Sequence, residues 1–232
     1  MAETAKKYGL VIHTHLAETK KEFDDCMAQH GATPTAYVDR CGILTDKTIL
    51  AHSVALTDAD IELLAERRSV LVHMPVSNMK LVSGHFRYDS AALFNKCRWA
   101  IGTDGASSNN SLSMLGEMKT AALRGKDLTG DPKAMKAADV FCAATRSGAE
   151  AFGIDAGVIE EGRLADCILV DLNNHNLVPG FNLVSDMVYA ADSSCIDTVI
   201  CDGRFLMRGG HVNGEEEIIA EAREAAKRLT AC

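Results

Sequence analysis

Short apolar, β-branched runs alternate with amphipathic stretches over about the first 150 residues. This alternation is typical of βα units built around a parallel sheet. The apolar runs predict strands at 9–15, 48–52, 69–73 and 99–104. The amphipathic stretches predict helices at 20–30, 35–41, 58–67 and 111–124, the third of them starting at a capping-box pair of Thr57 and Asp60.

The predicted strands end at His15, His52, His73 and Asp104, about 20 to 40 residues apart, close to the roughly 30 residues of one unit in a (β/α)8 barrel. Catalytic groups of such barrels lie at the carboxyl ends of the strands. One histidine at a strand end is more often structural than functional. Four successive strand ends with a metal-binding or acid-base side chain predict a functional site.

Beyond Gly153 the pattern changes to shorter strands, predicted at 166–170, 197–201 and 204–208, with a turn at Asp202 and Gly203. A charged helix at 215–229 follows, with an acidic start and a basic end that suit the helix dipole. This part of the chain predicts a small β module followed by a helix.

Composition excludes several classes of function. A net charge of −8 and 5% aromatic residues disfavour binding to nucleic acid. No apolar run reaches the roughly 20 residues of a membrane helix, and residues 1–9 lack the apolar core of a secretory signal, so we expect a cytoplasmic protein that does not bind membranes. The eight cysteines form no Cys-x-x-Cys pair, which disfavours a thiolate zinc site or a redox motif.

The first strand carries two histidines that project to the same side, His13 and His15. Only one of them need be a metal ligand. Glu18 follows three residues later, where its carboxylate could reach a substrate, although a capping or solvated glutamate is the alternative. Asp104 lies in a loop of glycines and small polar residues that would let backbone approach a ligand closely, with an Asx-type turn as the alternative.

Several segments together resemble the amidohydrolase superfamily, and within it the S-adenosylhomocysteine and methylthioadenosine deaminases and their chlorohydrolase relatives. The matching segments are His13-Thr14-His15-Leu16-Ala17-Glu18-Thr19, Leu50-Ala51-His52, His73-Met74-Pro75-Val76-Ser77-Asn78-Met79-Lys80-Leu81 and Gly102-Thr103-Asp104-Gly105. Residues 144–149 and 162–166 resemble the place where such chains leave the barrel for a small β-sandwich.

The resemblance implies a role for each matching residue. His15 would be the metal ligand of the fifth barrel strand, and Asp104 a metal ligand of the eighth that also takes a proton from water. His52 would orient that water, Glu18 would move protons to the ring and the leaving group, and Ser108 would contact the substrate. His13 is a further candidate, as is His73, for which a structural role is an equal alternative.

The implied function is a metal-dependent hydrolase that deaminates an adenosine-type nucleoside such as S-adenosylhomocysteine or methylthioadenosine. The implied cofactor is one divalent metal, with zinc named first and iron, manganese or nickel left open. A chlorohydrolase, a guanine deaminase-like enzyme and a non-catalytic fragment or assembly module are the alternatives. The substrate would be a small nucleoside or heteroaromatic molecule.

The family pattern begins with a His-x-His pair on the first strand, and the resemblance places this chain at the fifth. We therefore expect an α/β fold that is the second half of a (β/α)8 TIM-type barrel, with an incomplete metal site. The expected divisions are a half-barrel catalytic region at 1–153, part of a small β-sandwich at 154–212 and a C-terminal helix at 213–232. Unpaired strand edges would require a second copy of the chain or a complementing N-terminal half, unless the chain is a fragment.

Overall fold

The computed structural model describes residues 1–230, and its first sheet consists of four parallel strands in sequence order. These strands are β1 (Ile12–Leu16), β2 (Thr48–His52), β3 (Val70–His73) and β4 (Arg98–Ile101). Leu16 pairs with His52, and His73 pairs with Ile101, so the carboxyl ends of the strands lie along one edge of the sheet. The predicted βα order is confirmed, and the sheet is consistent with part of a barrel.

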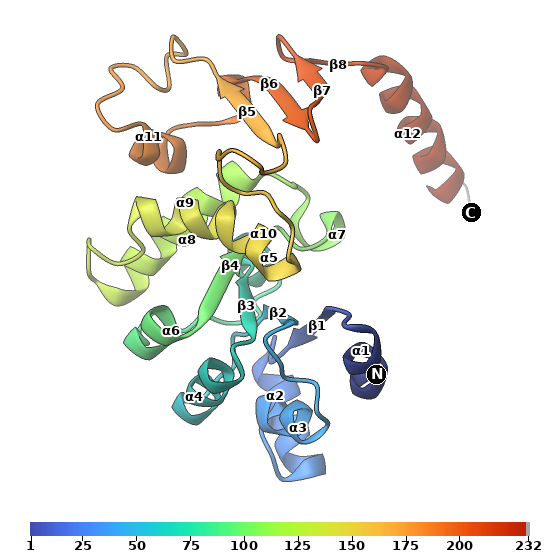
Figure 1. The fold of residues 1–232 in the computed structure, drawn as a ribbon, viewed down its shortest axis with the longest axis vertical. Coiled ribbons are helices and arrows are strands. Elements are labelled where there is room, and N and C mark those ends of the chain that lie inside the picture. The colour runs from blue at the N-terminus through green and yellow to red at the C-terminus, as the bar shows by residue number, and fades with distance from the viewer. Residues whose placement is uncertain (231–232) are drawn as a thin grey trace.

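Helices alternate with these strands and follow them along the chain. They are α1 (Ala2–Tyr8), α2 (Lys20–His30), α3 (Pro34–Arg40), α4 (Asp58–Arg67), α5 (Pro75–Lys80), α6 (Ala91–Lys96), α7 (Ala106–Asn109), α8 (Met114–Thr129), α9 (Ala137–Ala144) and α10 (Arg146–Phe152). Figure 1 shows α2, α4, α6 and α8 following one another along the sheet. The main core lies between these helices and the sheet, where Leu50, Leu71, Leu64 and Leu93 are fully buried.

Two predicted strands had wrong boundaries. The first begins at Ile12 rather than at residue 9, because α1 precedes it and Gly9 ends that helix in the left-handed conformation. The fourth ends at Ile101 rather than at Asp104, which lies in the loop beyond the strand with a φ of 60°. The candidate site residue that follows β4, Asp104, therefore lies in a loop and not on the strand.

The helix predicted at 111–124 also lies farther along the chain. The Ser113 hydroxyl accepts a hydrogen bond from the Gly116 N–H and so begins α8, and Gly130 ends it. The helix predicted at 58–67 has the predicted bounds, and both hydrogen bonds of the capping box between Thr57 and Asp60 are present.

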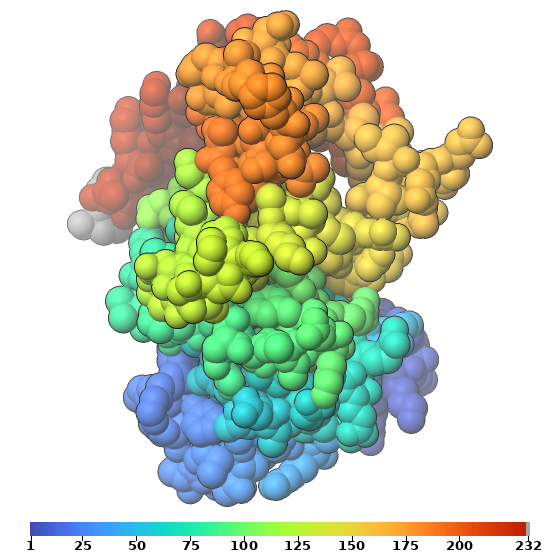
Figure 2. Space-filling model, turned by 90° about the vertical axis from the view of Figure 1, so that its left-hand side faces the viewer, coloured from blue at the N-terminus to red at the C-terminus, as the bar shows by residue number. Residues whose placement is uncertain are grey.

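The second sheet is antiparallel, and its strands also follow sequence order. It consists of β5 (Cys167–Val170), β6 (Ile196–Cys201), β7 (Arg204–Arg208) and β8 (His211–Val212), with α11 (Leu183–Tyr189) and the 3₁₀ turn η1 (Ser193–Cys195) between β5 and β6. The predicted turn joins β6 to β7, with Asp202 and Gly203 both at positive φ as a type I′ hairpin requires. Figure 2 shows the chain stacked in sequence order, from blue at one end to orange and red at the other.

Contacts between the two parts are made mainly by α11, whose Met187 belongs to a cluster packed against Leu115 of α8 and Phe141 of α9. The second sheet itself is poorly covered. Phe205 and Leu206 are neighbours on β7 and therefore point to opposite faces, yet their side chains are 52% and 53% exposed. The C-terminal helix α12 (Glu215–Thr230) buries none of its residues and projects away from the sheets in Figure 1.

Among residues 1–230, none of the helices combines the length and the apolar composition that crossing a bilayer requires.

Candidate metal centre

Three side chains from different strand ends converge at the carboxyl edge of the parallel sheet. His15, His52 and Asp104 each offer a ligand atom, and these atoms lie within 4.8 Å of one another. His15 comes from β1, His52 from the end of β2, and Asp104 from the loop after β4. The fold thus brings together residues that are up to 89 positions apart in the sequence and are of the types that bind divalent metals.

The side chain of His52 is buried, and one of its two ring nitrogens is hydrogen-bonded. Its Nδ1 lies 2.8 Å from Oδ1 of Asn78, which can only accept a hydrogen bond. With the Asn78 amide in this orientation, the neutral ring carries its proton on Nδ1, and Nε2 keeps its lone pair. Such a ring can bind a metal or accept a proton from water at Nε2.

The carboxylate of Asp104 is held by two hydroxyls. Ser77 of α5 and Ser108 of α7 each donate a hydrogen bond of 2.6 Å to Oδ2. Burial, the largest single influence, raises the pKa of Asp104. The hydrogen bonds from Ser108 and Ser77, with smaller contributions from the Gly105 backbone and His52, outweigh it and hold that pKa below its ordinary value. The carboxylate is therefore ionised near neutral pH and suited to a cation.

Glu18 lies beside this cluster, with Oε2 3.7 Å from Nε2 of His52. Its other oxygen, Oε1, accepts a hydrogen bond of 3.1 Å from the buried Ser83 hydroxyl. The side chain is about one quarter exposed, so it remains open to a ligand. This position is compatible with the proton transfer that the sequence predicted for Glu18.

The loop that carries Glu18 is fixed by a residue that sequence reasoning missed. The carboxylate of Glu22 accepts hydrogen bonds of 2.8 Å from the N–H groups of Ala17 and Glu18. Thr19 in turn accepts from the Glu22 N–H, at the spacing of a capping box. The Thr19-x-x-Glu22 spacing was the sequence signal that could have revealed this support.

Backbone strain concentrates at the same place. Ala17, His52, Ser53 and Asp104 all have φ between 49° and 70°, a region that residues other than glycine rarely adopt. Such conformations cost about 1–3 kcal/mol each and persist only where the surrounding structure imposes them. Their clustering around the three converging side chains supports a functional site.

The other two candidate histidines lie outside the cluster. His13 is exposed, and its ring meets the edge of Phe152 of α10, with centroids 5.8 Å apart. His73 is buried in the core, where Nε2 lies 2.5 Å from the Tyr88 hydroxyl oxygen and the ring stacks on Phe86. Burial, with a smaller contribution from His52, lowers the pKa of His73 to about 3. Its ring is therefore uncharged near neutral pH.

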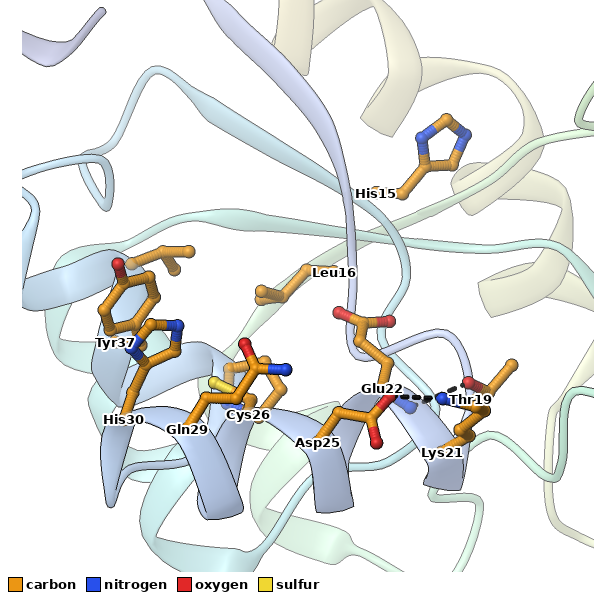
Figure 3. Close-up of a pocket in the computed structure, with 12 residues that line it drawn as sticks. His15, Leu16, Thr19, Lys21, Glu22, Asp25, Cys26, Gln29, His30 and Tyr37 are labelled. Carbon is orange, nitrogen blue, oxygen red and sulfur yellow. Dashed lines mark hydrogen bonds and ion pairs between the residues drawn. The ribbon is translucent and has the colours of Figure 1, made fainter.

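A pocket of about 500 Å³ opens between β1, α2 and α3, and His15 forms part of its lining. Figure 3 shows Glu22, Asp25 and His30 projecting from α2, with Tyr37 beside His30. The rings of His30 and Tyr37 stack with centroids 4.0 Å apart. Neither His52 nor Asp104 lines this pocket, so His15 is the one member of the metal-competent cluster that borders it.

Comparison with characterised proteins gives consistent matches over nearly the whole chain. The 5'-deoxyadenosine deaminase of Methanospirillum hungatei is 46% identical over 98% of the chain, and the 5-methylthioadenosine/S-adenosylhomocysteine deaminase 1 of Archaeoglobus fulgidus is 47% identical over 99%. The chain covers 51% and 55% of these relatives. It therefore spans about half the length of the curated relatives it matches.

The solved structure of an adenosine deaminase from Xanthomonas campestris with bound zinc superposes with a TM-score of 0.94 and 36% identity, covering 99% of this chain and 53% of that one. A zinc complex of the atrazine chlorohydrolase from Arthrobacter aurescens superposes with a TM-score of 0.88 and 25% identity, covering 96% and 50%. The model of the Amidohydrolase family matches residues 1–206. Given this match, the barrel-like parallel sheet and the similarity to curated deaminases, the chain belongs to the amidohydrolase family.

Proposed function

We propose that this chain supplies the C-terminal half of the active-site barrel in a metal-dependent hydrolase that deaminates an adenosine-type nucleoside. S-adenosylhomocysteine, methylthioadenosine and 5'-deoxyadenosine are the candidate substrates, since relatives at 46–47% identity are named for them. The convergence of His15, His52 and Asp104 beside Glu18 is the observation that carries the proposal.

The residues present fit a divalent metal. Two imidazoles and one carboxylate within 4.8 Å provide the nitrogen and oxygen ligands that zinc accepts. In the proposal His15 and Asp104 hold the ion, and ligands from the other half of the barrel complete the site. One zinc ion is the proposed cofactor, in keeping with the zinc bound in both solved structures described above.

When bound, a divalent metal lowers the pKa of a coordinated water towards about 7. The overall reaction adds one water to the ring carbon that bears the amino group and releases ammonia. In the proposal, the ionised Asp104 takes the first proton from the water, and the lone pair on Nε2 of His52 orients the attacking oxygen. Glu18 takes the second proton of that water and delivers it to the purine ring. It then passes the proton held by Asp104 to the departing amine, so that both carboxylates end the reaction ionised.

Ser108 was predicted to contact the substrate. Its hydroxyl proton is engaged by Asp104, so in the proposal Ser108 offers the substrate an oxygen lone pair. His13 and His73 are not assigned a catalytic role.

The proposed organisation keeps the divisions at 1–153, 154–212 and 213–232, as half barrel, β-sandwich part and C-terminal helix. Among the described residues, β1 and β4 each pair with a strand on one side only. Such edges recruit further strands. We therefore include in the proposal a complementing N-terminal half barrel or a second copy of the chain. The cysteines among residues 1–230 are free thiols, which suits a reducing cytoplasmic compartment.

The test measures metal content and ammonia release for the 232-residue chain, alone and mixed with an N-terminal half barrel taken from a relative. The substrates are S-adenosylhomocysteine, methylthioadenosine, 5'-deoxyadenosine and adenosine. Zinc near one per chain and ammonia release in the mixture would support the proposal. A zinc content far below one per chain, with no ammonia release from any of these nucleosides, would overturn the proposal and favour a non-catalytic module. Chloride release from a chlorotriazine would instead indicate a chlorohydrolase.

A further inference from the structure

Glu117 is a fully buried carboxylate on α8 for which neither the sequence pattern nor the proposed reaction provides a role. Only 1% of its surface is exposed. Oε1 accepts a hydrogen bond of 2.6 Å from Nδ2 of Asn109, and Oε2 accepts one of 3.2 Å from the Val76 N–H. Both oxygens act as acceptors, which matches the ionised form of the side chain.

These contacts connect Glu117 to the two segments that hold Asp104. Val76 precedes Ser77 on α5, and Asn109 follows Ser108 on α7, and both of these serines donate to Oδ2 of Asp104.

Asn109 makes a third connection. Its Nδ2 also donates a hydrogen bond of 2.6 Å to the carbonyl oxygen of Thr103, the residue directly before Asp104. Val76, Asn109 and Thr103 are therefore each one residue away from Asp104 or from one of its hydrogen-bond donors.

A buried carboxylate is costly, because removal from water disfavours its charge. Burial raises the pKa of Glu117, and the hydrogen bonds from Asn109 and Val76 oppose that effect. An apolar side chain at this position would avoid the cost but would leave the Val76 N–H and the Asn109 amide without an acceptor. The carboxylate is thus the side chain that can link both segments at once.

We propose that Glu117 is a positioning residue for Asp104, holding α5 and the 103–109 segment so that Ser77 and Ser108 fix the orientation of the Asp104 carboxylate. The inference rests on the proposed function, in which Asp104 is a metal ligand. Supporting partners of metal ligands commonly contribute a factor of about 10 to 100 in metal affinity.

The test compares E117Q with N109D and with the double variant E117Q/N109D, in the 232-residue chain. In E117Q the new amide nitrogen faces an N–H donor, so the hydrogen bond from either Asn109 or Val76 is lost. In N109D two carboxylates face each other. The double variant restores a donor and an acceptor between the two side chains with their direction reversed, and the amide oxygen introduced by E117Q can still accept from the Val76 N–H. It does not restore the hydrogen bond to the Thr103 carbonyl, because the aspartate at 109 cannot donate. The exposed Glu62, which pairs with Lys96, gives the matched control E62Q.

Two quantities are measured for each variant. The first is hydrogen exchange of the backbone amides at 75–80 and 103–110 without metal, and the second is the dissociation constant for Zn²⁺. For E117Q we expect faster exchange confined to these two segments and about 10- to 100-fold weaker zinc binding, with no change in E62Q. The double variant should recover relative to N109D, but not to the level of the unsubstituted chain, because the Thr103 carbonyl still lacks its donor. If E117Q unfolds the chain, N109A provides a second comparison, because it retains the Glu117 contact to Val76 while removing the hydrogen bonds of Asn109 to Glu117 and to the Thr103 carbonyl.

Unchanged local exchange in E117Q and N109A would overturn the positioning role. So would faster exchange at 75–80 and 103–110 together with zinc affinity equal to that of the unsubstituted chain. If the unsubstituted chain binds zinc no better than D104N, while E117Q still accelerates exchange in the two segments, the proposed metal role of Asp104 fails but the positioning of its carboxylate by Glu117 is supported.

Discussion

The imidazole of His52 stacks on that of His15, with ring centroids 5.3 Å apart and ring planes inclined by 24°. The two residues end neighbouring parallel strands, and the pairing of Leu16 with His52 sets their relative height. In this register His15 lies opposite Ala51, so a regular pleat would place His15 and His52 on opposite faces of the sheet. The backbone of His52 departs from that pleat, because its φ of 70° lies in the left-handed region. The register of β1 and β2 and this backbone conformation therefore decide together whether a two-histidine site forms.

Asp104 is predicted to be required for metal binding. The D104N variant keeps the shape of the side chain and an oxygen that can accept from Ser77 and Ser108, but it loses the negative charge. We expect zinc content after equilibration to fall at least about 10-fold, measured by elemental analysis. The exposed Asp127 provides the control D127N, which should retain zinc, and equal zinc in both variants would contradict the ligand role.

Glu18 is predicted to act in proton transfer without holding the metal. In the protein that carries the complete barrel, E18Q should lower kcat for ammonia release by about 10²–10⁴-fold, the usual contribution of a general acid or base. Zinc content should not change, because the cluster of metal-competent groups does not include Glu18. The exposed Glu66 supplies the control E66Q. Loss of zinc in E18Q would show instead that this carboxylate is a ligand.

Stability should decrease in acid because of His73. Burial lowers its pKa in the folded chain to about 3, whereas an unfolded histidine titrates near 6.5. Between these values the unfolded chain binds a proton that the folded chain does not. The free energy of unfolding should therefore fall as the pH drops below 6.5, by up to about 1.4 kcal/mol for each pH unit.

The H73Q variant tests this origin, because glutamine can still accept from the Tyr88 hydroxyl but does not titrate. Urea denaturation at several pH values between about 4 and 7 should give a shallower pH dependence for H73Q than for the unsubstituted chain. The exposed His211 provides H211Q, which should keep the original dependence. Identical slopes for all three proteins would exclude His73 as the cause.

The interior between α4 and the sheet is predicted to contribute strongly to stability. Leu64 is fully buried, and L64A should lower the free energy of unfolding by about 2–5 kcal/mol, because it removes buried methyl groups and leaves a cavity. Leu123 is 49% exposed on α8, so L123A should have a much smaller effect. Chemical denaturation measures both, and similar losses would mean that Leu64 is not packed as described.

Local sequence signals were sufficient to predict most of the longer helices and strands. The strand 48–52 and the helices 20–30 and 58–67 have the predicted bounds, because a continuous apolar run, a capping threonine or a terminal glycine marks their ends. Short helices such as α5 and α7 were missed. They contain 6 and 4 residues, too few for the periodicity that identifies a helix.

The sequence by itself determined which residue types stand at the strand ends, and it predicted the residues that the structure brings together as His15, His52 and Asp104. Tertiary structure decided which histidines could take part. His13 lies on the same strand as His15 but contacts Phe152, and His73 ends its strand in the core against Tyr88. Only the fold revealed the supports from Asn78, Ser77 and Glu117, since these hydrogen bonds join segments up to 41 residues apart and depend on helix packing that no local pattern encodes.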